Sequence, residues 1–410
     1  MIKLILLFFL LGSASGKVPN TPLKTYDLKE RRNTLLSWGK LGRQSCPTLT
    51  SPTPPQVQHP PLTAKDYGDL ERYLTRGTMA CMSPQGLNQC LKLKEWLENQ
   101  MIPQLFLPDP KSWGKHGWYL SEERRLPISI HVSKLLSLMA IALWTIEPLS
   151  PLTSDKKISF KKWFLHRLKI YEPPLSGSDY EFKDDQQSIK ISKKAHNIWI
   201  SHSKALASVS LAFQDHSLIS SWKSQWNSTL GHTRADGSLP IESRRGARAL
   251  WYSQQALSDL TLIYWIAKQF QLDLFQLFPQ TKKAYFQAVD FVLSTLIDQN
   301  KIKSYASANF EPGPDSDPSL QDFSSLQGRI TWLLAFSHLW PKNPLNRKIT
   351  QLKLDRSSCK VDHKASGLPC REKVISAKII FQKMESYIFP LHPGCFLLTK
   401  KQAQWLYALP

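Results

Sequence analysis

Long stretches of the chain place an apolar residue at every third or fourth position. This spacing brings the apolar side chains onto one face of an α-helix. It predicts helices over residues 85–100, 131–149, 159–171, 196–213, 248–270, 284–299 and 328–340. Alternating apolar and polar residues, the pattern of a half-buried strand, are scarce. The pattern therefore predicts an all-α protein of paired antiparallel helices, without a clear internal repeat.

Clusters of Pro, Gly, Asn and Asp separate the helical stretches, as in "EPPLSGSD" and "NFEPGPDSDPS". Residues 46–61 carry six prolines and form either a disordered linker or an extended arm laid over a domain. We expect residues 17–68 to be an extended, proline-rich N-terminal arm. The helical domain then covers residues 69–353, and residues 354–410 form a less periodic C-terminal tail packed on it.

The first sixteen residues, "MIKLILLFFLLGSASG", have the composition of a secretory signal peptide. Lys3 supplies the positive start, Leu4 to Leu11 the apolar core, and Ala14 and Gly16 the small residues of a cleavage site. The apolar run is too short to span a bilayer, which needs roughly 20 residues. We therefore predict an exported protein, periplasmic or secreted, without a membrane span.

The chain is strongly basic, with 53 Lys and Arg against 32 Asp and Glu and a formal net charge of +21. Such a charge favours a polyanionic partner through long-range attraction and counterion release. Nucleic acid, an anionic membrane surface and an acidic polysaccharide all qualify. Export counts against nucleic acid as the first choice.

Six cysteines in an exported chain indicate disulfide bonds. The sequence contains no CxxC pair and no HExxH motif. A structural zinc site is therefore not expected.

The stretch "RADGSLPIESRRGARALWY", residues 234–252, concentrates cationic and aromatic side chains where a helix is predicted to begin. Asp236 and Gly237 indicate a turn, and the "LPIE" segment after them a helix start. Arg245 and Tyr252 are seven residues apart, which is two turns along one helical face. Arginine offers a fork of donors to a carboxylate, and tyrosine a phenol that can move a proton. The alternative is a solvated, Arg-rich first turn followed by a core tyrosine.

A second candidate stretch is "KKAHNIWISHSK", in which His196, Trp199 and His202 fall at spacings that share one helical face. A histidine on a helix is more often structural than catalytic. The spacing alone does not choose between the two roles.

Both stretches resemble a known family. "DGSLPIESRRGARALWY" and "AHNIWISHSKALASVSLAF" are similar to the two central motifs of the bacterial periplasmic alginate lyases, a family of polysaccharide lyases, and the interval between them also matches. Weaker similarities, among them "LTAKDYGD", "CLKLKEWLENQ" and "RITWLLAF", extend the resemblance from about residue 46 to about residue 337.

The resemblance implies an α/α barrel, an incomplete toroid of helical hairpins that binds an acidic, uronate-containing polysaccharide. It implies β-elimination, which leaves a 4,5-unsaturated sugar, with alginate as the leading substrate. By position, Arg245 would neutralise the uronate carboxylate, His196 would be a neutraliser or base, and Tyr252 the acid/base. Trp199 and Arg248 would bind substrate.

Further expectations follow from the same resemblance. Lys65 would lie on a loop that covers the substrate, and Cys46 would pair with Cys90. No cofactor or metal is expected, no nucleic acid partner, and a monomeric state. A local bridge between Cys359 and Cys370 is a further expectation from their spacing alone.

The chain departs from the family at the catalytic motif. Ala195 stands where the family has an asparagine before the histidine, Ile198 where it has an aromatic residue, and Ser253 where a histidine usually follows the tyrosine. A lost donor at the developing charge weakens catalysis in comparable sites. Two hypotheses therefore stand side by side: a lyase acting on a uronate polymer, and a catalytically degenerate binding protein for acidic polysaccharide. A helical envelope protein that binds nucleic acid or anionic lipid would explain the charge but not the paired motifs.

Overall fold

The fold is taken from a computed structural model of the chain. It describes residues 27–46, 54–55, 64–101, 125–173, 180–184, 187–191, 196–298, 300–306, 330–355, 374–376, 381 and 391–407. Within these residues, no helix is long and apolar enough to cross a membrane. The predicted signal peptide lies outside them.

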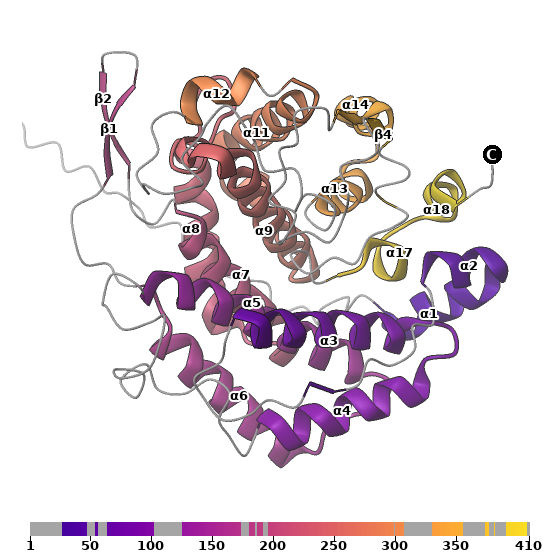
Figure 1. The fold of residues 1–410 in the computed structure, drawn as a ribbon. Coiled ribbons are helices and arrows are strands. Elements are labelled where there is room, and N and C mark those ends of the chain that lie inside the picture. The colour runs from indigo at the N-terminus through magenta and orange to yellow at the C-terminus, as the bar shows by residue number, and fades with distance from the viewer. Residues whose placement is uncertain are drawn as a thin grey trace, which may run out of the picture.

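The long helices alternate between an inner and an outer layer (Figure 1). The inner helices contact one another in chain order: α3 (Ala64–Met82), α5 (Arg125–Ile146), α7 (Asn197–Phe213), α9 (Ala249–Gln269) and α13 (Trp332–Leu339). The outer helices return the chain between them: α4 (Leu87–Met101), α6 (Ser154–Ile170), α8 (Ile219–Gly231) and α11 (Pro279–Ile297). This is an incomplete α/α barrel, and it confirms the predicted fold class.

Shorter elements complete the described chain. They are α1 (Leu28–Ser37), α2 (Lys40–Ser45), α10 (Leu274–Leu277), α12 (Asn300–Ala306), α14 (Leu345–Gln351), α17 (Pro393–Phe396) and α18 (Lys400–Tyr407). Two antiparallel hairpins accompany the helices: β1 (Tyr180–Asp184) with β2 (Gln187–Ile191), and β3 (Lys353–Asp355) with β4 (Val374–Ser376). The prediction of an extended arm over residues 17–68 is wrong where α1, α2 and the start of α3 are helical.

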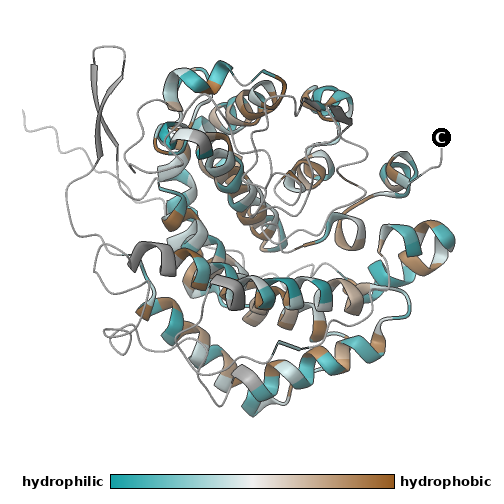
Figure 2. Cartoon of the chain, in the orientation of Figure 1, coloured by the Kyte–Doolittle hydropathy of each residue, from teal (hydrophilic) through white to brown (hydrophobic). Residues whose placement is uncertain are grey.

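Apolar burial holds the two layers together. The outer helices α4 and α6 carry both apolar and polar residues around their circumference (Figure 2). In α6, Phe160, Phe164 and Leu168 recur every four residues and are buried, which turns one face of the helix to the core. One core cluster joins α3 to α7, and a second joins α7 to α13 and the C-terminal helices. The helix α7 therefore belongs to both halves of the core.

The C-terminal segment bridges the two ends of the inner series. The short helix α17 contacts both α13 and α3, and a disulfide joins Cys395 in α17 to Cys46 at the end of α2. Arg31 of α1 donates to the carbonyl oxygens of Cys395 and Gly394, at 2.8 and 3.0 Å. The N-terminal and C-terminal segments thus close the gap between α3 and α13, the first and last inner helices.

The expected pairing of Cys46 with Cys90 is wrong. Cys90 pairs with Cys81, nine residues earlier, across the turn that connects α3 to α4. Cys46 instead meets Cys395, 349 residues away, because α2 and α17 lie together where the barrel closes. The expected bridge between Cys359 and Cys370 lies outside the described residues.

Candidate active site

His196 sits at the N-terminal end of α7 as its capping residue. Its backbone is extended, with φ −73° and ψ 145°, and its Nδ1 accepts the N–H of Ile198 at 3.2 Å. Ser, Thr, Asp and Asn usually serve as the acceptor at this position. The cap fixes the orientation of the imidazole ring, which is only 8% exposed.

The segment before α9 turns sharply at Asp236 and Gly237, as predicted. The N–H of Arg234 bonds the carbonyl of Ser238 at 3.0 Å, and Gly237 adopts φ +93°. A Cβ at Gly237 would lie 2.1 Å from the carbonyl oxygen of Gln287. Glycine is therefore required here both by the backbone angle and by the close approach of α11.

The expected helix start near "LPIE" is wrong. Two short 3₁₀ turns follow instead, η5 (Glu242–Arg244) and η6 (Gly246–Arg248), and α9 begins only at Ala249. Arg245 therefore lies between the two turns, with φ −97° and ψ 37°, and does not share a helical face with Tyr252.

The two residues nevertheless meet, by a different route. The guanidinium carbon of Arg245 lies 4.0 Å from the centroid of the Tyr252 ring, a cation–π distance. Nη1 of the same guanidinium lies 3.1 Å from Nε2 of His196. Arg245 is buried, at 5% exposure, and Tyr252 is half-buried in the first turn of α9. The three residues predicted to be catalytic thus form one cluster at the N-terminal ends of α7 and α9.

Glu242 anchors this cluster, a role that the sequence did not reveal. Its Oε1 accepts the N–H of Asn197, the first residue of α7, at 2.8 Å, and the residue is 1% exposed. A carboxylate is favourable at this end of a helix because the exposed N–H groups carry partial positive charge. The bond holds the η5 segment, and with it Arg245, against the helix that begins beside His196. Nothing in the spacing of the motif indicates that Glu242 would reach α7.

The electrostatics of the cluster keep the histidine neutral. Burial, and then the neighbouring charge of Arg245, lower the pKa of His196 from 6.5 to about 3. A neutral imidazole carries one proton on one of its two nitrogens. The N–H of Ile198 faces Nδ1 at 3.2 Å. Nη1 of Arg245 faces Nε2 at 3.1 Å, so both ring nitrogens face a donor and the neutral ring can accept from only one of them.

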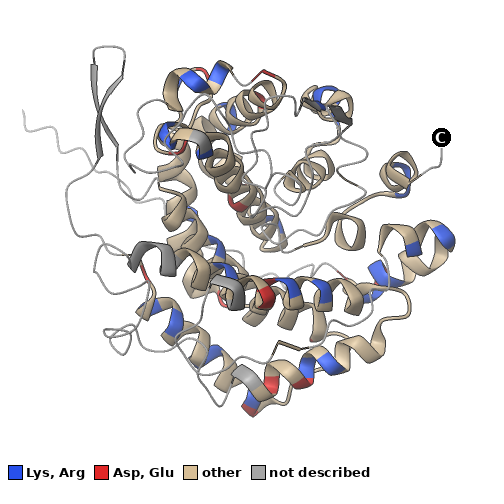
Figure 3. Ribbon diagram, in the orientation of Figure 1, with Lys and Arg blue, Asp and Glu red and all other residues tan. Residues whose placement is uncertain are grey.

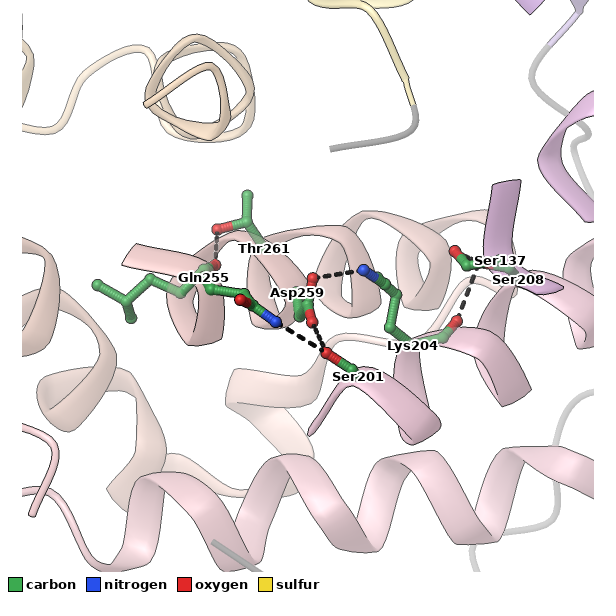
Figure 4. A network of polar contacts seen from close by, with 8 residues as sticks. Ser137, Ser201, Lys204, Ser208, Gln255, Asp259 and Thr261 are labelled. Carbon is green, nitrogen blue, oxygen red and sulfur yellow. Dashed lines mark hydrogen bonds and ion pairs between the residues drawn. The ribbon is translucent and has the colours of Figure 1, made fainter. Parts of the chain in front are cut away.

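A second polar cluster ties the same two helices together deeper in the barrel (Figure 4). Lys204 of α7 and Asp259 of α9 form an ion pair at 2.7 Å, with side chains 2% and 0% exposed. The hydroxyl of Ser201 donates to the other oxygen of Asp259, and Gln255 of α9 donates to Ser201 at 3.4 Å. We call Ser201, Lys204, Gln255 and Asp259 the α7–α9 polar network.

The predicted substrate-binding residues lie in different surroundings. Trp199 is buried, contacts His202 edge to face at 6.2 Å, and lines a cavity between α6 and α8. None of the three clustered residues lines that cavity. Arg248 is half-buried as the residue that precedes α9. Lys65 lies in the first turn of α3 rather than on a loop, and its side chain is outside the described part of the chain.

The departures from the family motif are accommodated by ordinary packing where they are described. Ser253 is buried, and its hydroxyl donates to the carbonyl of Ala249 in the preceding turn, at 2.8 Å. Ile198 is buried in the first turn of α7. Ala195 lies outside the described residues. In the part of the chain that is described, no group of three or more His, Cys, Asp or Glu side chains is placed to hold a metal ion.

Comparison with known proteins gives one family and one fold. Residues 129–302, which contain the whole cluster, match the model of the alginate lyase family. No curated protein matches the chain in sequence. Among solved structures, alginate lyase A1-III from Sphingomonas species A1 superposes with a TM-score of 0.52 at 18% identity, over 78% of this chain and 89% of that one.

Two further structures agree. A tyrosine-to-phenylalanine variant of alginate lyase A1-III in complex with a tetrasaccharide gives a TM-score of 0.59 at 14% identity, over 93% of this chain and 98% of that chain. An alginate lyase from Bacteroides ovatus gives 0.54 at 14% identity, over 78% and 93%. At these identities the likeness concerns the fold.

Proposed function

We infer that this chain, which carries an alginate lyase family domain over residues 129–302, is a polysaccharide lyase that cleaves a uronate-containing polymer by β-elimination. The reaction removes the proton at C5 of a uronosyl unit and breaks the C4–O4 glycosidic bond. A C4–C5 double bond remains on one product, and the proton passes to the leaving oxygen. Alginate is the substrate that the family match favours.

One observation carries the proposal: the buried contact between His196 and Arg245. Nε2 of the neutral histidine and Nη1 of the guanidinium lie 3.1 Å apart. In the tautomer that carries its proton on Nε2, both groups are donors, and one carboxylate oxygen can accept from both in charge-assisted hydrogen bonds. The uronate carboxylate is such a group. Its neutralisation is what the chemistry needs, because a second negative charge develops beside it when C5 loses its proton.

Tyr252 supplies the group that moves the proton. Its ring lies under the guanidinium of Arg245 at 4.0 Å, so a positive charge stands beside the phenol while the proton is in transfer. As the phenolate, the oxygen of Tyr252 takes the proton from C5, and the phenol so formed gives that proton to O4 of the departing sugar. His196 is held neutral and capped, and in this mechanism it binds the carboxylate.

The test replaces the phenol oxygen alone. We expect Tyr252→Phe to lose about 10²–10⁴-fold in kcat, the usual contribution of a general acid/base, while polymer affinity stays within a few-fold. Turnover is measured as the ultraviolet absorbance of the C4–C5 double bond, on alginate and on other polyuronates. Tyr305→Phe is the matched control: its hydroxyl bonds Asp236 in the same region, at 2.7 Å, and takes no part in the cluster.

Three results would contradict the proposal. Turnover by Tyr252→Phe at the wild-type rate would exclude the phenol as acid/base, and equal losses in both variants would indicate a structural effect. If the wild type binds the polymer but forms no unsaturated product, the chain is a binding protein and not a lyase.

We also propose that the protein acts outside the cytoplasm. Its two described disulfides, Cys46–Cys395 and Cys81–Cys90, are typical of an oxidising compartment. The signal-like first sixteen residues agree with export. N-terminal sequencing of the mature protein, expected to begin near Lys17, tests this.

A further inference from the structure

The cavity between α6, α7 and α8 is outside the proposed active site and has no role in the mechanism above. Its volume is about 420 Å³, within the range of about 300–1,000 Å³ typical of ligand pockets. We call it the α6–α8 pocket. It is lined by residues of α6, α7 and α8, by Glu172 after the end of α6 and by Leu218 before α8: Leu165, Leu168, Lys169, Glu172, Trp199, His202, Ser203, Leu206, Leu218, Ser221, Ser224, Gln225 and Ser228.

The α7 wall of the pocket pairs an aromatic surface with a buried polar ring. Trp199 and His202 meet edge to face at 6.2 Å. His202 is only 4% exposed, and its Nδ1 has no hydrogen-bond partner. Burial lowers the pKa of His202 to about 4, so the ring is neutral at physiological pH and can both donate and accept. A large aromatic side chain beside a small number of polar groups is the usual composition of a ligand site.

The α8 wall presents hydroxyl groups. Ser221, Ser224 and Ser228 recur at three and four residues, so they lie on one face of α8, and all three line the pocket. Each hydroxyl can donate one hydrogen bond and accept two. Such a row can exchange hydrogen bonds with a ligand that is itself rich in hydroxyl groups.

The mouth of the pocket carries one cation, Lys169, and one carboxylate, Glu172. On α6, Lys156, Lys157 and Lys161 form ion pairs with Glu98, Glu147 and Asp215. Lys169 of the pocket forms no ion pair among the described residues and is exposed, as is Lys162 two turns earlier. Figure 3 shows this basic character of α6. Glu172 also lies at the mouth and is exposed, where its carboxylate can accept from a sugar hydroxyl.

We propose that the α6–α8 pocket is a second saccharide-binding site, which holds a uronosyl unit apart from the site of cleavage. The face of the sugar packs on Trp199, its hydroxyl groups bond the serines of α8 and the ring of His202, and its carboxylate is held at the mouth by Lys169. The choice of a uronosyl unit rests on the proposed function and on Lys169, which forms no ion pair among the described residues. Such a site would keep the polymer on the enzyme between cleavage events.

The test counts binding sites directly. A trisaccharide of mannuronate is titrated by calorimetry into the Tyr252→Phe variant, which keeps the ligand intact, and we expect two classes of site. Lys169→Glu should weaken one class at least tenfold. Lys162→Glu is the matched control, since it makes the same charge change on the same helix outside the pocket lining. Ser228→Phe, which fills the pocket, should abolish that class.

Several outcomes would overturn the proposal: a single class of site in Tyr252→Phe, two classes that persist in Lys169→Glu, or equal losses from Lys162→Glu. The last of these would mean that α6 acts only through its overall charge. Lys169→Glu changes an exposed side chain and should fold even if Ser228→Phe does not. Because binding is measured without turnover, a failure here leaves the rate test of Tyr252 untouched, and an inactive wild type would still bind at the pocket.

Discussion

Replacing Lys204 with methionine tests how the two helices that carry the candidate active site are held together. The Lys204–Asp259 pair is fully buried, with its charged atoms 2.7 Å apart. Removing the lysine leaves the carboxylate of Asp259 in the core with only the hydroxyl of Ser201 as a described partner. Breaking a buried pair in this way typically costs about 3–5 kcal/mol. We therefore expect Lys204→Met to lower the free energy of unfolding by that amount.

The matched control is a lysine pair at the surface. Lys157 bonds Glu147 at 2.9 Å, with side chains 41% and 28% exposed. Water and salt screen this pair, and such pairs contribute about 0–1 kcal/mol. Lys157→Met should thus cost several-fold less than Lys204→Met. Both are measured by urea unfolding followed by circular dichroism, with the disulfides intact.

A double variant separates the loss of attraction from the penalty of an unpaired charge. Replacing both members, as Lys204→Met with Asp259→Leu, removes the buried charges together. The hydroxyl of Ser201 can then turn to a carbonyl of its own helix. Buried pairs replaced by apolar residues are often as stable as the original, so we expect most of the loss to be recovered. If Lys204→Met costs no more than Lys157→Met, or if the double variant is worse than the single one, the network does not join the helices as described.

Two further predictions concern the disulfides and the response to acid. Cys46–Cys395 closes a loop of 349 residues, so its loss should lower the free energy of unfolding by about 6 kcal/mol on chain entropy, against about 3 kcal/mol for Cys81–Cys90. Urea unfolding of the serine variants measures both losses. A larger loss for Cys81–Cys90 would contradict the prediction. The pKa of His202 falls on folding from 6.5 to about 4, so its unfolded form binds more protons between these values. Its contribution to stability is present above about pH 6.5 and is lost as the pH falls toward 4. In His202→Asn, the free energy of unfolding should therefore fall less between pH 6.5 and pH 4 than in the wild type. An unchanged fall would exclude His202 as a cause of the acid sensitivity.

The hydrophobic pattern was sufficient for the fold class and for most of the long helices. Helices α4 to α7, α9, α11 and α13 follow the predicted stretches because each buries a face against a neighbour. The pattern missed α3, which lies outside every predicted stretch. It also missed α8, whose "SSWKSQWNST" is largely polar although Trp222 and Trp226 are fully buried on one face. It also missed the β1–β2 hairpin, in which Phe182 lies opposite Ile189.

The candidate site was predicted in its residues and not in its geometry. The sequence brought Arg245 and Tyr252 together on one helix, but the structure does so through two 3₁₀ turns and the Glu242 anchor. The cysteine pairing failed for a related reason. Six cysteines allow fifteen connectivities, and the partner of Cys46 depends on where the barrel closes, which no local pattern encodes.

The position of the α7–α9 polar network explains why a buried ion pair is useful in this core. Lys204 lies eight residues after His196 on α7, and Asp259 seven after Tyr252 on α9, about 12 and 10.5 Å along the two axes at 1.5 Å per residue. The ion pair therefore sits at nearly the same depth below both ends of the candidate site. Apolar side chains would let the helices slide, because their contacts are not directional. If α7 slid along α9, Lys204 and Asp259 would separate and leave two unpaired buried charges. The pair therefore favours the one relative position of the two helices in which His196, Arg245 and Tyr252 meet.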